Sequence, residues 1–493
     1  MNSAIFIIFG FLILAIYLGI RATKGKNMSL EQWSVGGRGF GAVFIFFLMA
    51  GEIYTTFTFL GASGWAYGKG GPALYVLAYL SLCYLSIYWI GPMIWKYAKD
   101  HKLMSQSDFF ARKYNSPYLG VLVVIIGVLS LIPYIVIQLK GLGIIVSEAS
   151  YGMISPSLAI WIGAISVTVY VMISGIHGSA WTAVIKDILI FGVVIFIGIY
   201  IPFHYYDGVE PMFKEIVSAQ PDFLKIPEEG LSISWFISTV LLASLGSIMW
   251  PHVFSAVYSA KDAKSIRKNA VISPLYTLML LFIFFVGFAA ILQVPGLKGA
   301  DADLSLLRLS IQTFDPWFVG LIGAVGLLAA IVPGSMLLMT TATALSKNVY
   351  HVFVPSASEE KIARLAKALI PVITLISVYF TLSGGDTIVT LLLMGLSLVT
   401  QLLPSFFCSL MKNNFVTKQG AAAGMIVGVG TVIYITITKT TITTLFPSAP
   451  QALQDLNVGI VALVVNVTVM VIASLFTKEV DSHSADKVES QSA

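Results

Sequence analysis

Long apolar segments recur along the whole chain, and each is long enough to cross a bilayer. About 20 consecutive apolar residues span the hydrocarbon core as a helix. Of the 493 residues, 57% are apolar and only 11% are charged, too few charges to cover a soluble domain. The segments are continuous rather than alternating, which excludes a β-barrel. We therefore predict an all-α polytopic membrane protein with about thirteen spans, near residues 3–22, 41–68, 74–98, 117–149, 155–175, 180–203, 232–258, 270–294, 312–347, 360–383, 388–411, 419–439 and 457–477.

Basic residues collect in alternate loops, such as "RATKGK", "KYAKDHK" and "KDAKSIRK". By the positive-inside rule these loops are cytoplasmic, which predicts an outside N-terminus, a cytoplasmic C-terminus and a multi-pass protein of the plasma (inner) membrane. This topology accounts for the formal net charge of +5, so no nucleic-acid partner is expected. Cys83 and Cys408 lie in apolar runs and are expected to be packing residues rather than a disulfide or metal pair.

Two spans contain helix breakers at matching positions. "LMAGEIYTTFTFLGASGWAYGKGG" carries Gly51, Gly61 and Gly64, and "LLASLGSIMWPHVF", five spans later, carries Gly246 and Pro251. Non-helical backbone at membrane depth survives only inside protein or beside a cavity, and paired breaks predict inverted repeats with a midplane site. The expected organisation is an N-terminal helix and cytoplasmic loop (1–40), a first five-helix repeat (41–203), an extracellular loop (204–231), a second repeat (232–411), two C-terminal helices (412–477) and a disordered cytoplasmic tail (478–493).

Charged residues stand inside the predicted span at 180–203. A central Lys or Asp costs roughly 2.5–3.5 kcal/mol on insertion scales, so Lys186 and Asp187 require a reason. Lys186 either has a functional partner at depth or extends to the inner interface. Asp187 points about 100° away on the helix, toward another helix or the loop. Glu52 raises the same question: it would pair with Lys186, carry a second proton or face a vestibule.

Four sequence segments resemble the sodium:solute symporter family: "VGGRGFG", "FLGASGWAYGKG", "YSAKDAKSIRKNA" and "QLLP". The resemblance covers residues 1–480 and implies a LeuT-like core of five plus five helices, with one helix before it and two after it. Within the family, "GEIYTTFTFLGASGWAYGKG" most resembles the monocarboxylate permeases, which handle pyruvate, lactate or short fatty acids.

The resemblance also implies a sodium site between the first and eighth core helices. Carried onto this chain, its carbonyl ligands fall at Gly51, Tyr54 and Ala330, while its two hydroxyl ligands fall at Pro333 and Gly334, which have no hydroxyl. Hydroxyls stand nearby at Ser335, Thr340 and Thr341.

A further departure concerns the fifth core helix, where relatives typically read Trp-Thr-Asp-x-(x)-Gln. This chain has Ala183 in place of the Asp and Lys186 in place of the Gln. One hypothesis explains all these departures: a tethered ammonium replaces Na⁺, as in some sodium-independent transporters of the wider superfamily. Protonated Lys186 would donate to the Gly51 and Tyr54 carbonyls, and its deprotonation would couple transport to H⁺. Coupling to Na⁺ is the alternative.

The solute is expected where the first and sixth core helices break, because half-helix N-termini favour a carboxylate. The candidate substrate-binding residues are Thr55, Thr56, Thr58, Tyr134, Gln138, Ser244 and Ser247, and the candidate gating residues are Phe57, Phe59 and Trp65. Back-bonding of the hydroxyls and ordinary inter-helix hydrogen bonding are the alternatives. Isolated His177 and His252 are expected to be structural, and no Arg lies in the central spans, which favours a small solute.

These features favour a secondary active symporter that imports a small organic solute, of the short monocarboxylate type, without a cofactor. A Na⁺-coupled symporter of proline, pantothenate or a similar solute is the alternative. A channel would need a continuous polar pore, an enzyme would need motifs that are absent here, and a sensory receptor would need a signalling domain for which the short tail leaves no room. The expected partners are the solute and the bilayer; a monomer suffices for transport, and the oligomeric state is unknown.

Overall fold

The computed structural model describes residues 3–25, 28–51 and 54–489, and within these ranges the chain forms helices and no strand. The helices of the body are α1 (Ser3–Thr23), α3 (Ala42–Ala50), α4 (Ala62–Lys69), α5 (Tyr75–Asp100), α7 (Pro117–Ala149), α8 (Pro156–Tyr206), α10 (Ile233–Gly246), α11 (Pro251–Ser259), α12 (Ala263–Thr277), α13 (Leu280–Gln293), α15 (Pro316–Ala344), α17 (Glu359–Ser383), α18 (Ile388–Val399), α19 (Leu403–Leu410), α20 (Lys418–Thr438) and α23 (Val458–Glu489).

Short helices connect them or extend their ends. They are α2 (Leu30–Val35), α6 (Gln106–Lys113), α9 (Val209–Ala219), α14 (Ser305–Thr313), α16 (His351–Phe353), α21 (Ile442–Leu445), α22 (Gln451–Gln454), the 3-10 turns η1 (Gly36–Arg38), η3 (Gly71–Leu74), η4 (Ser247–Met249), η5 (Gly299–Leu304) and η7 (Thr400–Leu402), and the π-helical turns η2 (Phe57–Gly61) and η6 (Leu345–Tyr350).

Within the described ranges, ten helices are long and apolar enough to cross a membrane, or eleven when the bent pair α10–α11 counts as one span. The predicted number of thirteen spans therefore stays a prediction. Part of the difference lies in α8, whose 51 residues would reach about 77 Å as one rod, more than twice the roughly 30 Å hydrocarbon core.

Gly175 divides α8 into two segments that match the predicted spans at 155–175 and 180–203. Its backbone is not helical (φ 51°, ψ −153°), a conformation that residues with a side chain rarely adopt. A Cβ at this position would also lie 2.5 Å from the Trp33 indole. The kink lets the second segment of α8 begin against α2.

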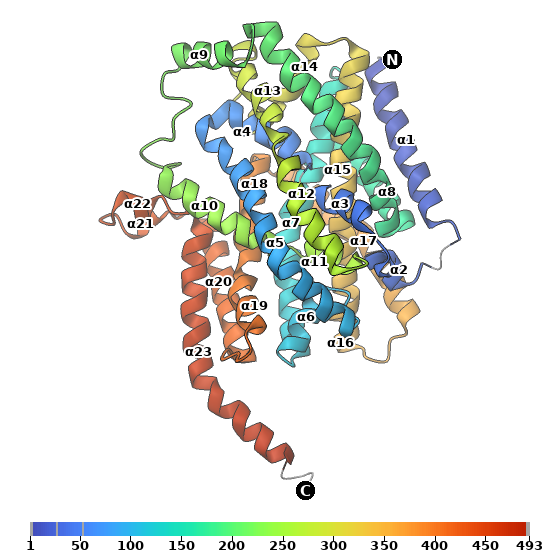
Figure 1. Ribbon diagram of the computed structural model, residues 1–493, viewed down its shortest axis with the longest axis vertical. Helices are drawn as coiled ribbons and strands as arrows, with labels where there is room; N and C mark the ends of the chain where they lie inside the picture. Colours follow the sequence, from blue (N-terminus) through green and yellow to red (C-terminus); the bar gives the residue numbers. More distant parts are fainter. Residues whose placement is uncertain (1–2, 26–27, 52–53, 490–493) are drawn as a thin grey trace.

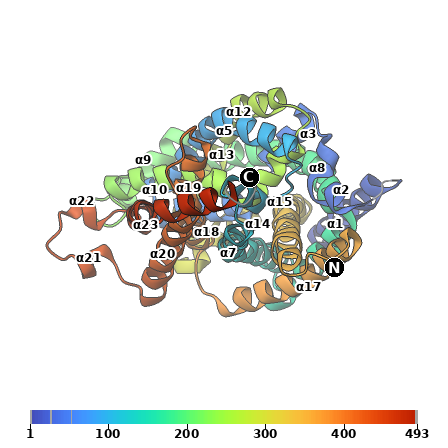
Figure 2. The same ribbon diagram turned by 90° about the horizontal axis from the view of Figure 1, so that it is seen from below.

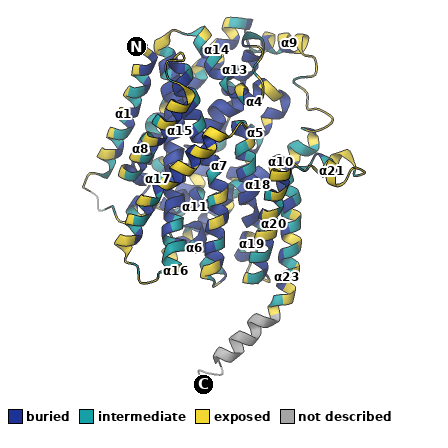
Figure 3. Ribbon diagram, turned by 180° about the vertical axis from the view of Figure 1, so that it is seen from behind, coloured by how far each residue is buried: buried dark blue, intermediate teal, exposed yellow. Residues whose placement is uncertain are grey.

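The centre of the bundle is formed by α7 and α15, and the C-terminal helices lie at its side. In the most apolar part of α15, 94% of the residues are buried, against 28% in α23. Figure 2 shows α7 and α15 surrounded by other helices, with α20 and α23 packed together at one side. Figure 3 shows the same contrast in burial. Any site built on α7 and α15 is thus enclosed by protein.

The bundle has two ends, which we name by their position in Figure 1. The N-terminus, α9 and α14 lie at the upper end, and α6, α16 and the C-terminus lie at the lower end. The loop predicted at 204–231 contains the helix α9. Helix α23 extends to Glu489, and the disorder predicted for the tail at 478–493 stays a prediction.

Both predicted breaks are present. Helix α3 ends at Ala50 and helical structure resumes at η2, while α10 and α11 are bent by 53° about Trp250. At the lower end the two broken elements are joined by backbone hydrogen bonds, from Phe40 N to Ser259 O (3.2 Å) and from Lys261 N to Phe40 O (2.9 Å). The breaks therefore lie within a continuous protein framework.

Candidate cation site and solute cavity

The Lys186 side chain reaches the first break and has no solvent exposure. Its Nζ donates to the carbonyl oxygens of Gly51 (3.0 Å) and Tyr54 (2.9 Å). These are the two carbonyls that the resemblance implied as ion ligands. The structure thus brings the three residues together within the bundle, and Lys186 does not extend to an interface.

The local sequence explains this position. The break between α3 and η2 leaves carbonyl groups without helical partners, and such groups need donors at membrane depth. After the kink at Gly175, residues Ser179, Ala183 and Lys186 follow at spacings of four and three, so they share one face of α8. Ala183 and Ser179 are small, and the long Lys186 side chain can extend along that face to the break.

Asp187 forms an ion pair with Lys186. Its Oδ1 lies 3.0 Å from Lys186 Nζ, although adjacent residues leave a helix about 100° apart. The flexible four-carbon stem of lysine allows the ammonium to return to its neighbour. The carboxylate also interacts with the side chain of Tyr276 on α12. Asp187 thus connects the ammonium on α8 with a second helix.

Two tyrosines pack beside this ion pair. The Tyr54 hydroxyl donates to the carbonyl oxygen of Tyr276 on α12 (3.3 Å), and the two ring centroids lie 4.8 Å apart. Tyr54 is fully buried, which keeps water away from that side. Glu52, the other acidic candidate, lies outside the described residues.

The α15 side of the expected ion site is less complete. Ala330 is fully buried, but no hydrogen bond connects its carbonyl with Lys186 in the described part of the chain. A Cβ on Gly334 would meet Val167 and Gln138 at 3.5 and 3.6 Å, so this position faces α7 and the first segment of α8. The Ser335 hydroxyl instead meets that of Ser179 at 2.7 Å, on the α8 face that carries Lys186. Ser335 directly follows Gly334, one of the two positions where the resemblance implies a hydroxyl ligand.

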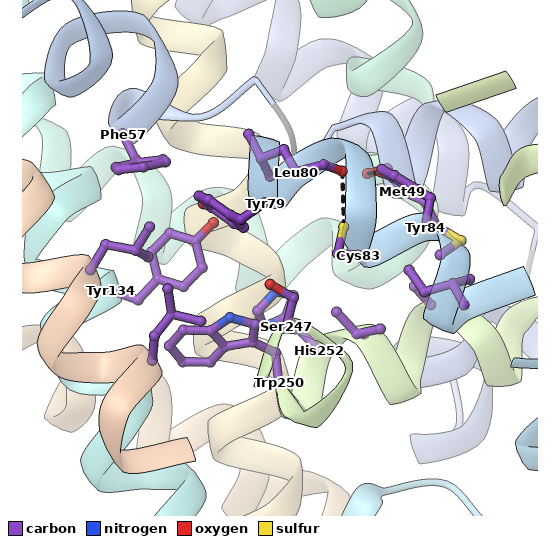
Figure 4. Close-up of a pocket in the computed structure, with 15 residues that line it drawn as sticks. Met49, Phe57, Tyr79, Leu80, Cys83, Tyr84, Tyr134, Ser247, Trp250 and His252 are labelled. Carbon is purple, nitrogen blue, oxygen red and sulfur yellow. Dashed lines mark hydrogen bonds between the residues drawn. The ribbon is translucent and has the colours of Figure 1, made fainter. Parts of the chain in front are cut away.

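A cavity of about 70 Å³ lies between the two breaks. Since about 10–15 Å³ of such volume holds one water, the cavity has room for roughly five, or for a small organic molecule. Figure 4 shows the rings of Phe57, Tyr79, Tyr134 and Trp250 around it. Its walls are mostly apolar, with polar groups from Tyr79, Tyr134, Ser247 and His252, and no charged side chain lines it in the described ranges.

The threonines of the first break have separate roles. Thr55 Oγ1 accepts from Phe57 N (3.1 Å), and Thr58 Oγ1 accepts from Thr55 N (3.0 Å), so both cap the start of the second half-helix. Thr56 Oγ1 donates to Gln138 Oε1 on α7 (2.9 Å). These hydroxyls thus have protein partners and lie outside the cavity wall, while Tyr134 forms part of it.

Some candidates on the second break and some gating candidates line the cavity, and others do not. Ser244 and Ser247 both donate to the carbonyl four residues earlier (2.6 Å each), the alternative noted for them, and of the two only Ser247 lines the cavity. Phe57 lines the cavity as well. Phe59 is fully buried outside it, and Trp65 stacks on Trp235 at a centroid distance of 5.7 Å, away from the cavity.

Sequence reasoning missed several lining residues. His252 and Trp250 follow the second break and join Tyr134 in an aromatic cluster, with centroid distances of 5.7 and 5.2 Å from the Tyr134 ring. Tyr79 and Met49 complete other walls. The proximity of His252 to a helix break was the available signal. His177, in contrast, meets Gln32 Oε1 at 3.2 Å in a structural position.

Comparison with known proteins identifies the family. The sequence model of the sodium:solute symporter family matches residues 33–428, so the chain belongs to that family. The resemblance and the all-α polytopic fold class are thereby confirmed, and both family and fold are those of transporters rather than enzymes.

Individual relatives are similar along nearly the whole chain. "Uncharacterized symporter YhjB" of Bacillus subtilis is 66% identical over 99% of this chain and 100% of its own length. "Monocarboxylate transport permease protein" of Rhizobium johnstonii is 26% identical over 87% of this chain and 88% of its own. Among solved structures, an outward-open Na⁺-coupled sialic acid symporter shares the fold with a TM-score of 0.78 and 18% identity, over 97% of this chain and 98% of its own.

Proposed function

We propose that this protein imports a small monocarboxylate by alternating access and that Lys186 takes the place of the sodium ion, with H⁺ as the coupling cation. The observation that carries the proposal is the double donation from Lys186 Nζ to the Gly51 and Tyr54 carbonyls. A cation is needed where a broken helix presents carbonyls, and this chain supplies one covalently. The donor set suits Na⁺ poorly, because the amine already occupies two carbonyls and Gly334 offers no hydroxyl.

The proton balance follows from the ion pair. Protonated Lys186 beside ionised Asp187 has no net charge; loss of one proton leaves a neutral amine beside a carboxylate. Asp187 Oδ1, at 3.0 Å from the ammonium, is the ionisable group that can accept that proton and then release it. One H⁺ moving with one carboxylate transfers no net charge, so uptake would respond to a pH gradient more than to voltage. We infer from the basic loops that the lower end faces the cytoplasm.

A small monocarboxylate is supported by two observations. The cavity of about 70 Å³ suits a molecule of few atoms, and its apolar aromatic walls suit a short alkyl chain. The half-helix ends at the two breaks present backbone dipoles to a carboxylate. The printed name of the Rhizobium relative agrees with this substrate class.

A second candidate is Na⁺-coupled uptake of another small solute such as proline. Family membership favours it, as does the broken-helix carbonyl geometry that remains available for an ion if Lys186 moves away.

The test is uptake by proteoliposomes with pH and Na⁺ gradients imposed separately, across pyruvate, lactate, acetate, proline and pantothenate. We expect a short monocarboxylate to accumulate with an inward proton gradient and without Na⁺. Accumulation of proline or pantothenate driven only by Na⁺ would contradict the proposal.

A further inference from the structure

A second lysine–aspartate pair lies toward the upper end, where η5 meets α7 and α18. Lys140 Nζ on α7 donates to Asp303 Oδ2 on η5 (2.8 Å) and to the carbonyl oxygen of Asp386 (2.7 Å). The backbone N–H of Ile388, at the start of α18, donates to the same Asp303 oxygen (3.1 Å). An ammonium and a helix N-terminus thus converge on one carboxylate, which is an anion-binding arrangement.

Holding this ion pair inside the protein costs free energy, because the charged groups lose their contact with water. The Asp303 side chain is 1% exposed and Lys140 is 19% exposed. Asp303 Oδ1 makes no hydrogen bond within the described part of the chain. A buried carboxylate oxygen without a donor is unfavourable, so Asp303 fills the anion site incompletely. A free carboxylate of different shape would compete with it there.

The segment that carries Asp303 packs against α4, which follows the first break. A Cβ on Gly64 of α4 would lie 2.9 Å from the Ala302 carbonyl oxygen, and Ser63 meets Ser305 at 3.3 Å, so η5 is pressed against the second half of the broken helix. The anion site is near the cavity as well: Ile388 lies one turn before Leu392, a cavity-lining residue of α18, which is about 6 Å along the helix.

Two glycines precede Asp303 at positions with open space around them. Gly296 and Gly299 have φ values of 93° and 54°, and a Cβ would meet no atom within 4 Å at either position. If η5 moves away from α4, Lys140 and the Ile388 N–H lose their carboxylate together. A solute that passed between η5 and α18 would then meet these two donors about one helix turn from the cavity.

We propose that Lys140 and the Ile388 N–H form an outer carboxylate-binding site, which Asp303 occupies while the upper end is closed and the carboxylate of the incoming solute occupies once η5 has moved. This inference rests on the proposed function for the class of solute. It adds an entry site distinct from the cavity between the two breaks, and it makes Asp303 an internal competitor of the solute.

The competition predicts opposite effects from the two partners. Lys140→Gln removes the site's charge and should raise the KM for external pyruvate about tenfold, the value of one charge-assisted hydrogen bond. Asp303→Asn removes the competitor and should lower that KM several-fold. Lys298→Gln removes one positive charge from an exposed residue five positions before Asp303 and serves as the matched control, with a KM near that of wild type.

The experiment measures initial uptake of radiolabelled pyruvate into right-side-out vesicles for these three variants and the wild type, with melting temperatures to show that each is folded. Opposite KM shifts for Lys140→Gln and Asp303→Asn support the outer site. Equal shifts in the same direction would mean that the pair only closes the upper end, and would overturn it. If wild-type vesicles take up no monocarboxylate, the proposed function itself fails, and the inferred occupant with it.

Discussion

Two lysine–aspartate pairs of this molecule, Lys186–Asp187 and Lys140–Asp303, differ in how their partners are held. Lys186 and Asp187 are neighbours on one helix, and the ammonium also binds two carbonyls of the first break. Lys140 and Asp303 are 163 residues apart and belong to different elements, one of them a short turn in a connection. Lys186 and Asp187 stay together on α8 when the surrounding helices rearrange. Lys140 and Asp303 can separate if η5 moves. A partner on the same helix suits an ion pair that stays together while a proton leaves and returns, and a distant partner suits a contact that is broken in each cycle.

Exchanging the charges separates the two pairs most strongly. Lys186→Asp with Asp187→Lys places a carboxylate against the Gly51 and Tyr54 carbonyls, so we expect uptake to be abolished. Lys140→Asp with Asp303→Lys retains an ion pair at the upper end and should retain measurable uptake with a raised KM. Uptake assays on the two double variants check this. Equal loss in both would remove the distinction between the pairs.

Neutralising Asp187 alone is the next largest effect. Asp187→Asn leaves the buried ammonium without its counter-charge, which costs about 3–5 kcal/mol when a buried pair is broken. We expect a lower melting temperature in detergent and at least about tenfold slower uptake. Asp187→Glu keeps the charge and should recover part of both. A stable, active Asp187→Asn protein would show that the carboxylate carries neither charge balance nor protons.

The kink that positions Lys186 can be tested at Gly175. Gly175→Ala forces a side chain into positive φ and places its Cβ against Trp33, so we expect a destabilisation of about 1–3 kcal/mol. Gly192, also on α8, has no atom within 4 Å of a Cβ, and Gly192→Ala is the matched control with little change. Thermal unfolding followed by fluorescence distinguishes them. Similar melting temperatures for both variants would contradict the structural role of the kink.

An effect of similar size is expected for Asp108 at the lower end, where α6 meets η6. Burial alone would raise the pKa of Asp108, but the charge of Lys347 and hydrogen bonds from Lys347, Met104 N and Asn348 lower it below its usual value. A lowered pKa means that the stabilisation is present above the ordinary value of about 3.9 and is lost as the pH falls through the folded-state pKa. Asp108→Asn should therefore cost about 1–3 kcal/mol at neutral pH. Melting curves as a function of pH should converge with those of wild type in acid; a constant difference would contradict this assignment.

Much of the fold and one part of the site could be predicted from the sequence. Apolar length identified the spans, the breakers identified both broken helices, and the cost of intramembrane charge singled out Lys186. The pairing of Asp187 was not predictable, because a helical wheel ignores the reach of a lysine side chain. Lys140 drew no attention, since its partner lies 163 residues away and only packing brings η5 to α7. His252 and Trp250 were missed because cavity walls depend on how the bend at the second break is oriented.

The most direct measurement is saturable binding of radioactive sodium to the purified wild-type protein at neutral pH. A Na⁺-coupled sialic acid symporter of the same fold serves as the positive control. With an ammonium seated on the first-break carbonyls, we expect no saturable binding. A stoichiometric, saturable sodium site that vanishes when residue 51 or 54 is perturbed would contradict the replacement of the ion by a side chain.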